Sequence, residues 1–221
     1  MDTRYFNITF FAKIILIVFT QSIFNSCSRK SDPFYIAFNK SQRKFANELI
    51  AYYDDFVLSK TDKDIALGDA YVKFLDKTVP DMIEHGNLSY LIPGYEQRDK
   101  FLKSLPREDL LEFYYIQDST YIYNRAEKKM ERKYIPFQLG LNTKGKYFYF
   151  LELLSDEKEF FKLYYENIAE LGTISPSTYA LILRDYAKID FNNKNERLVF
   201  IVHFLQIRKE IIREEINQNA P

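Results

Sequence analysis

Several residue types that would define a site or a scaffold are scarce in this chain of 221 residues. It has no tryptophan, two histidines and one cysteine. A single cysteine excludes a disulfide framework within the chain, which small exported domains often need for stability. With 47% hydrophobic and 28% charged residues, the composition is typical of a globular chain that can bury a core without such bridges.

The sequence also lacks an excess of either charge. It has 31 basic and 31 acidic residues, so its formal net charge is zero. Proteins that hold nucleic acid obtain most of their affinity from lysine and arginine side chains that neutralise phosphates. The balanced charge, interleaved along the chain, therefore predicts no nucleic-acid partner.

No motif for catalysis, phosphate binding or a metal is present. His85 and His203 lie far apart without the companion ligands of a metal site, and we interpret His203 as a core residue. The adjacent carboxylates Asp54-Asp55 and Glu214-Glu215 diverge on a helix and are interpreted as solvated surface. The sequence thus predicts no catalytic residue, no metal ligand and no cofactor.

Phenylalanine and tyrosine make up the whole aromatic fraction of 17%. Two interpretations fit: an A+T-rich genome, which we favour, or a surface adapted to glycans. Tyrosine pairs recur at 52–53, 114–115 and 164–165 on predicted helices, where one ring of each pair is expected to pack and the other to face solvent. A binding face built from the outer rings is the alternative that these pairs leave open.

The N-terminus carries the clearest signal. Arg4 and Lys13 precede a run without charge, Ile14–Ser26. As a helix this run would span about 20 Å, whereas a membrane-crossing helix must cover about 30 Å of hydrocarbon. Its length and flanks are those of a signal-peptide apolar region rather than of a membrane span.

The segment Phe24-Asn25-Ser26-Cys27 resembles the cleavage box of bacterial lipoproteins, in a loose form familiar from Bacteroidota. The resemblance covers residues 1–27 alone. It implies cleavage between Ser26 and Cys27 and acylation of Cys27, which also accounts for the single cysteine. Because no aspartate follows Cys27, the resemblance implies an outer-membrane anchor with the domain facing the periplasm.

Helical signals dominate the remaining chain. A helix is predicted from Ser41 to Val57, and another from an N-cap at Thr61 to Pro80. Helices are also expected over residues 95–105, from Pro106, over 156–171, from Ser175 to about Tyr186, and over 193–216. Within the last of these, residues 198–207 are apolar on almost every side and predict a central position in the core.

Residues 117–152 are ambiguous. Arg125–Lys133 is strongly charged and is predicted to be an exposed helix. Residues 137–150 fit either a β-hairpin around Asn142–Gly145 or a helix over Tyr147–Leu154, and we favour the helix slightly.

Together these patterns predict a mainly α fold: one irregular bundle of about seven to nine helices, with a small hairpin near 137–150 as an alternative. The predicted organisation is a signal peptide over 1–26, a lipidated tether over 27–39 and a helical domain over 40–221. The favoured function is an envelope lipoprotein that acts as an accessory subunit for another envelope protein, and not an enzyme. A glycan- or small-ligand-binding lipoprotein is the alternative, followed by an envelope enzyme.

The anchor prediction has a direct test. Cells grown with an alkyne fatty acid should incorporate label into the wild-type chain, and Cys27→Ala should lose it completely, because no other thiol is available for acylation. Fluorescence after coupling of the alkyne to a dye measures the label. Label that persists in Cys27→Ala, or a purified protein that retains Met1, would contradict the prediction.

Overall fold

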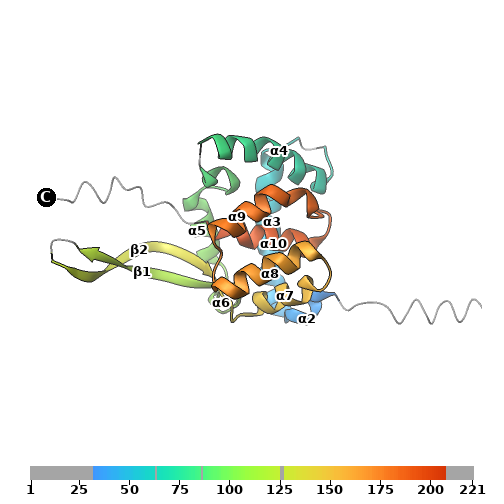
Figure 1. Cartoon of the computed structure of the whole chain (residues 1–221). Helices are drawn as coiled ribbons and strands as arrows, with labels where there is room; N and C mark the ends of the chain where they lie inside the picture. The colour runs from blue at the N-terminus through green and yellow to red at the C-terminus, as the bar shows by residue number, and fades with distance from the viewer. Residues whose placement is uncertain (1–31, 63, 86, 125–126, 208–221) are drawn as a thin grey trace, which may run out of the picture.

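A computed structural model describes residues 32–62, 64–85, 87–124 and 127–207 (Figure 1). In this part of the chain the fold is mainly α, with nine α-helices, as the sequence predicts. The helices are α2 (Pro33–Ala37), α3 (Lys40–Ser59), α4 (Leu67–His85), α5 (Tyr95–Ser104), α6 (Arg107–Phe113), α7 (Lys146–Ser155), α8 (Glu159–Leu171), α9 (Pro176–Asp185) and α10 (Lys194–Leu205). The short 3₁₀-helices η1 (Leu88–Leu91) and η2 (Tyr186–Lys188) join them.

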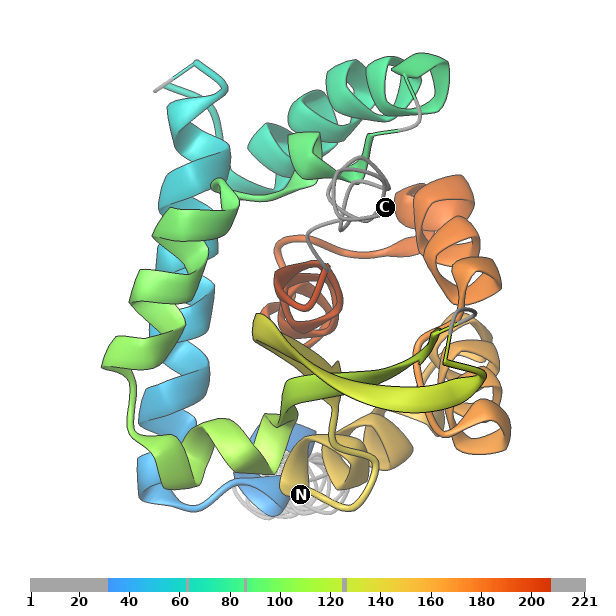
Figure 2. The same ribbon diagram turned by 90° about the vertical axis from the view of Figure 1, so that its left-hand side faces the viewer.

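Helix α10 lies in the centre and the other helices surround it (Figure 2). Every residue from Glu196 to Leu205 is buried, so this helix has no solvent-facing side along that length. This confirms the central position predicted from its apolar sequence. A helix buried on all sides must find partners for its polar groups within the protein.

Stacked aromatic rings form much of the core beside α10. Phe113 of α6 lies at the middle of one cluster, with ring centroids 4.8–5.4 Å from those of Phe38, Phe45 and Tyr147. Phe38 also stacks on Phe150 of α7, at 5.2 Å. Rings at these separations gain from offset and tilted packing beyond the area they bury. The abundant phenylalanine and tyrosine of the sequence are therefore largely core material.

The N-terminal part of the body begins earlier than predicted. Residues 27–39 were expected to be a tether, but Pro33–Ala37 form α2, and Phe34 and Phe38 are buried. The Asp32 side chain accepts a hydrogen bond from the Phe34 backbone N–H and caps this helix. Burial of these two large rings stabilises the segment enough to form a helix, although its composition is typical of a loop.

Helix α4 differs from the prediction at both ends. It begins at Leu67 rather than near Thr61, and it continues through Pro80 to His85. Thr61 instead donates its hydroxyl hydrogen to the carbonyl of Val57, closing α3. Met82, beyond the proline, is buried, and burial of this side chain favours continuation of the helix despite the hydrogen bond lost at Pro80.

The ambiguous region contains a long antiparallel hairpin, β1 (Tyr114–Asn124) and β2 (Lys129–Leu141). The predicted exposed helix over Arg125–Lys133 is wrong where the chain is described, because Lys129–Lys133 belong to β2. The segment 137–141 is a strand, but it pairs with the start of β1 rather than with 146–150. Residues 146–155 form α7, which confirms the helical alternative there.

Most other helix ends agree with the sequence. Gly172 adopts φ +67° and ends α8, and the Ser175 hydroxyl accepts a hydrogen bond from the Thr178 backbone N–H at the start of α9. The predicted helix over 193–216 is shorter: α10 ends at Leu205, and residues 208–216 lie outside the described part. Among the described residues, no helix has both the length and the apolar character needed to cross a membrane.

One buried ion pair joins α3 to α10. Arg197 Nε lies 3.1 Å from Asp54 Oδ1, and the Tyr71 hydroxyl donates to the same carboxylate at 2.7 Å. The guanidinium also donates to the carbonyl of Phe191. Asp54 was expected to be solvated together with Asp55; the structure places Asp54 in this cluster, and Asp55 alone is exposed.

Removal of the Asp54 charge should therefore be costly. Asp54→Asn is expected to lower the free energy of unfolding by about 2–4 kcal/mol, because it leaves the largely buried Arg197 without its counter-charge. Asp55→Asn on the same helix is the matched control and should change it by less than about 0.5 kcal/mol. Urea unfolding followed by circular dichroism measures both. Equal effects of the two substitutions would show that the pair does not hold α10 in place.

Candidate functional site

The residues predicted for lipid attachment, Ser26 and Cys27, lie outside the described residues. The structure does show where the described chain starts. Helix α2, whose N-cap is Asp32, lies on the side of the body opposite to the hairpin formed by β1 and β2 (Figure 1). The body therefore has two distinct ends, one next to the predicted anchor and one that carries the hairpin.

His203 is a core residue, as predicted from its apolar neighbours. It is fully buried on α10, and its ring lies against those of Tyr179 and Phe204. Its Nδ1 lies 3.0 Å from the Tyr164 hydroxyl. Burial lowers the pKa of His203 from 6.5 to about 3 and raises that of Tyr164 well above 10. The imidazole is thus neutral, and its Nε2 has no hydrogen-bond partner among the described residues.

His85 lies at the exposed end of α4 and is separate from His203. Its Nδ1 is 2.8 Å from the carbonyl oxygen of Asp81, and its ring meets the edge of Tyr90. These surroundings are not the polar cleft with carboxylates that an acid–base enzyme using either histidine would need. Among the described residues no group of histidine, cysteine, aspartate and glutamate side chains is arranged to hold a metal ion.

The tyrosine pairs do not form a common face. Tyr53, Tyr114 and Tyr164 are buried, so one ring of each pair packs in the core, as predicted. Their neighbours belong to three different elements, α3, β1 and α8, and the pair at 114–115, predicted on a helix, lies on a strand instead because these residues pair with Leu141 and Gly140. Tyr52 stacks on Phe101 with 3.8 Å between ring centroids, and of the three outer rings only Tyr115 is exposed, at 40%. The glycan-binding alternative requires outer rings that are gathered around one groove. The outer rings of these pairs are not arranged in this way.

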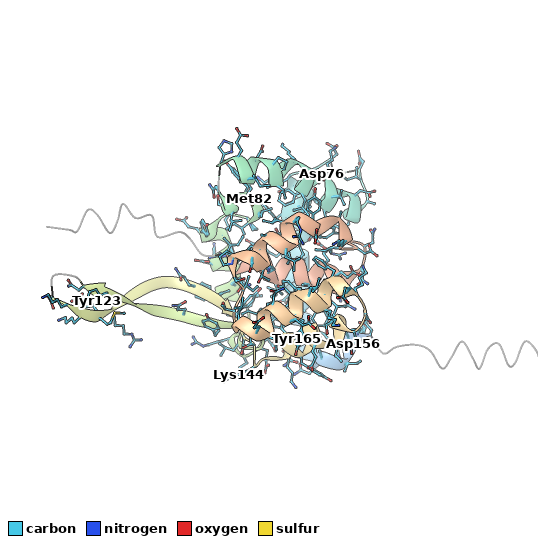
Figure 3. All side chains as sticks on the ribbon, in the orientation of Figure 1. Asp76, Met82, Tyr123, Lys144, Asp156 and Tyr165 are labelled. Atoms are coloured by element: carbon cyan, nitrogen blue, oxygen red, sulfur yellow. The ribbon has the colours of Figure 1, made fainter. Side chains whose placement is uncertain are left out.

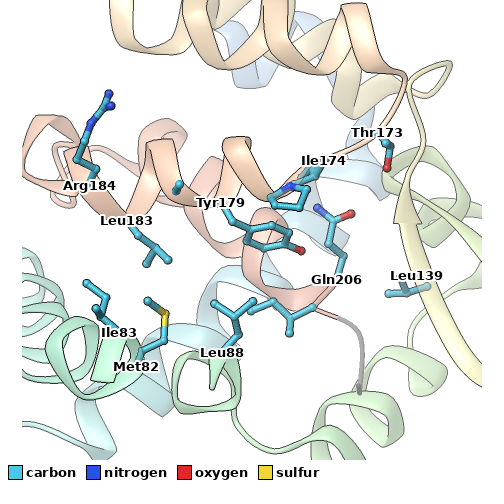
Figure 4. A pocket seen from close by; sticks show the side chains of 13 residues that line it. Met82, Ile83, Leu88, Leu139, Thr173, Ile174, Tyr179, Leu183, Arg184 and Gln206 are labelled. Carbon is cyan, nitrogen blue, oxygen red and sulfur yellow. The ribbon is translucent and has the colours of Figure 1, made fainter. Parts of the chain in front are cut away.

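A groove that sequence reasoning did not anticipate lies on the hairpin side of the body (Figure 4). It encloses about 850 Å³, within the size range of small-molecule sites. It is lined mainly by apolar side chains from α4, η1, β2, the loop between α8 and α9, α9 and the residues after α10: Met82, Ile83, Leu88, Leu139, Ile174, Pro176, Tyr179, Ala180, Leu183 and Ile207. These residues are far apart in sequence, so no local pattern could have brought them together.

Three polar residues line the same groove: Thr173, Arg184 and Gln206. Arg184 is mostly exposed and is held by Asp185, 2.9 Å from its guanidinium. Gln206 follows α10 and is only 5% exposed, and its Nε2 has no hydrogen-bond partner among the described residues. A buried amide donor without an acceptor is energetically costly.

The hairpin is the second feature that could bind another molecule, because its distal half is not covered by the rest of the body. Its root is buried: Tyr114 donates a hydrogen bond to the carbonyl of Val202 on α10, and Leu139 and Leu141 belong to the core. Its distal half projects from the body, and Tyr123 lies far out on it (Figure 3). There Tyr123 is 53% exposed and Met130 57% exposed, and the two form a cross-strand pair.

Comparisons with known proteins give no family for this chain. No family model matches the sequence, no curated protein is similar to it, and no solved structure matches the fold. The groove and the hairpin are therefore the features of the molecule from which a function can be inferred.

The buried histidine makes stability depend on pH. Because the pKa of His203 is depressed on folding, the unfolded chain binds a proton that the native chain does not. The contribution of the neutral His203 ring to the free energy of unfolding is therefore fully present above about pH 6.5. It is lost as the pH falls towards 3. When the pH is lowered from 7 to 4.5, the free energy of unfolding of the wild type should fall by about 2–3 kcal/mol more than that of His203→Gln.

Urea unfolding at both pH values measures this difference. His85→Gln is the control and should keep the wild-type pH dependence, because His203 is unchanged in it. A wild-type pH dependence in His203→Gln would show that other groups are responsible.

Proposed function

We propose that this chain is a membrane-anchored lipoprotein of the cell envelope that acts as an accessory subunit by binding another envelope protein through its hairpin. In this proposal the chain is cleaved between Ser26 and Cys27, and the acylated Cys27 anchors it in the outer membrane. The folded domain then faces the periplasm. The observation that carries the proposal is the projecting pair of strands, which presents exposed Tyr123 and Met130. The strands lie on the side of the body opposite to α2 (Figure 1).

The position of the anchor supports this arrangement. Cys27 precedes Asp32 by a short segment that can span at most about 20 Å even when fully extended. An acylated Cys27 would keep the α2 end of the body near the bilayer. The hairpin would then point away from the lipid surface, towards proteins in the periplasm.

The hairpin has the properties of an element completed by a partner. An isolated pair of strands is marginally stable in water unless a third strand or another surface covers it. Both strands have an outer edge without a further strand among the described residues, and such edges can pair with a strand of another chain. Tyrosine and methionine are enriched where proteins bind one another, because they bury large and adaptable apolar surfaces.

The distal residues should be in direct contact with the partner. A photo-crosslinking amino acid at position 123 or 130 should give the same higher-mass adduct in intact cells. The same amino acid at Tyr90 or Leu163, which are similarly exposed on the body, should not. Immunoblotting after irradiation compares the four positions.

Substitution gives an independent measurement of the same contact. Tyr123→Ser combined with Met130→Ser should lower recovery of the crosslinked species, or of its purified partner, by about tenfold or more, since exposed aromatic anchors often dominate an interface. Tyr90→Ser combined with Leu163→Ser is the matched control. If both double variants bind equally, or if all four positions crosslink alike, the hairpin is not the docking element.

A further inference from the structure

The two outer edges of the hairpin differ in composition. In the distal half, β1 runs over Ser119–Asn124 with the sequence Ser-Thr-Tyr-Ile-Tyr-Asn and carries no charge. The opposing stretch of β2 carries four charged residues: Lys129, Glu131, Arg132 and Lys133. Charged side chains discourage another strand from pairing with an exposed edge, whereas β-branched and aromatic residues favour strand pairing. The composition thus protects the edge of β2 and leaves that of β1 open.

An irregularity in the strand pairing separates the two edges further. At one point residues 135–137 of β2 lie opposite the single residue Asp118 of β1. The extra residues belong to β2, and Pro136 is among them. Bulges and prolines interrupt the regular row of backbone groups that a further strand needs. Strand β1 contributes no extra residue, so its own row of backbone groups continues to Asn124.

One backbone hydrogen bond shows which groups of β1 point outward. At the base of the hairpin, the Asn142 N–H donates to the carbonyl of Phe113 at 3.0 Å. In an antiparallel pair, residues whose backbone groups face the partner strand alternate with residues whose groups face away. The odd-numbered residues of β1 therefore face β2, and the N–H and C=O groups of Thr120 and Ile122 face outward. No further strand covers this edge among the described residues.

Tyr123 indicates what an added strand would meet on one face of the sheet. It pairs with Met130 of β2, and the two side chains are 53% and 57% exposed. A strand added to β1 would place one of its own side chains on the other flank of Tyr123, so that three side chains form a row across the sheet. An uncharged side chain fits there, because a charge would lose hydration beside these groups. The added segment is therefore extended and mostly uncharged, and it lacks proline because its amides must pair with β1.

A second copy of this chain does not fit the same edge. Antiparallel pairing of two β1 strands would place the two bodies at opposite ends of the shared sheet (Figure 1). Because α2 lies opposite to the hairpin, the two proposed anchors would then point in opposite directions and could not reach one membrane. Parallel pairing would bring the strands to about 4.8 Å, and the helices that lie on both sides of each hairpin root would collide (Figure 2). The occupant is therefore a strand of a different protein.

We propose that the hairpin binds its partner by strand addition: an uncharged, extended segment of a different envelope protein pairs with the outer edge of β1 over Ser119–Asn124. The added strand covers about 20 Å and exchanges hydrogen bonds with the outward backbone groups of Thr120 and Ile122. These main-chain bonds supply affinity, and the row of side chains at Tyr123 supplies selectivity. This proposal rests on the proposed docking role of the hairpin and adds the edge that is used and the kind of segment that it receives.

Proline substitutions on the two edges test this assignment. Thr120 and Lys133 are cross-strand partners whose amides point away from each other's strand, so a free edge tolerates proline at either position. A photo-crosslinking amino acid at position 123 of the full chain measures binding in intact cells. Thr120→Pro should lower the adduct by about tenfold or more, because a hydrogen bond and the close approach of the partner are both lost. Lys133→Pro should change it by less than about twofold. Thr120→Val keeps the amide and should bind like the wild type.

The crosslinked peptides test whether the partner segment is extended. Residues 121 and 123 lie on one face of β1, about 6.6 Å apart. Two residues of an extended strand cover that distance, whereas a helix needs about four. Mass spectrometry of adducts from crosslinkers at positions 121 and 123 should therefore find partner residues two positions apart, in a segment with few charges and no proline.

Other outcomes would overturn the proposal. Equal loss of adduct in Thr120→Pro and Lys133→Pro would show that binding needs the intact hairpin rather than the edge of β1. No loss in either variant would exclude the edge while hairpin docking stands. Partner residues three or four positions apart would assign the contact to a helix, and an adduct of twice the chain's mass would identify a second copy. If the wild type gives no adduct from position 123 or 130, the docking role fails, and strand addition fails with it.

Discussion

The burial of α10 on every side is the constraint from which the rest of the structure follows. Several charged and polar side chains on it find partners on other elements, on different sides of the helix. Asp54 pairs with Arg197, Lys158 with Glu196, and Tyr164 with His203. These contacts fix the direction and rotation of the surrounding helices more specifically than apolar packing alone can, because a rotated helix would leave a charge or a donor unpaired.

The end of α10 also positions both candidate sites. Tyr114 at the hairpin root donates to the carbonyl of Val202, so the strands leave the body at a place set by the central helix. At the last described residue, the buried Arg98 guanidinium donates to the carbonyl of Ile207. This contact holds Gln206 and Ile207 at the groove. The positions of the groove and of the hairpin thus both depend on contacts at the C-terminal end of α10.

Sequence reasoning succeeded where the signal is local and failed where it depends on distant residues. The caps at Ser175 and Gly172, the helix over 146–155 and the central position of residues 198–207 follow from patterns within a few turns. The strand at 129–133 carries charges compatible with helix or strand, and pairing with β1 decides between them. The ion pair of Asp54 and the groove at Gln206 require residues more than one hundred positions apart. The anchor at Cys27 lies outside the described residues and stays a prediction.

The place of α10 in the chain has a consequence for biosynthesis. The helix that completes the core occupies residues 194–205, after all the other described helices, so it leaves the ribosome later than the elements that cover it. Until it emerges, the earlier helices expose the faces that will cover it and cannot bury their polar partners. For the proposed exported protein this order is useful, because translocation through a narrow channel requires a chain that has not yet folded. The body would close only after α10 has followed the other helices out of the ribosome.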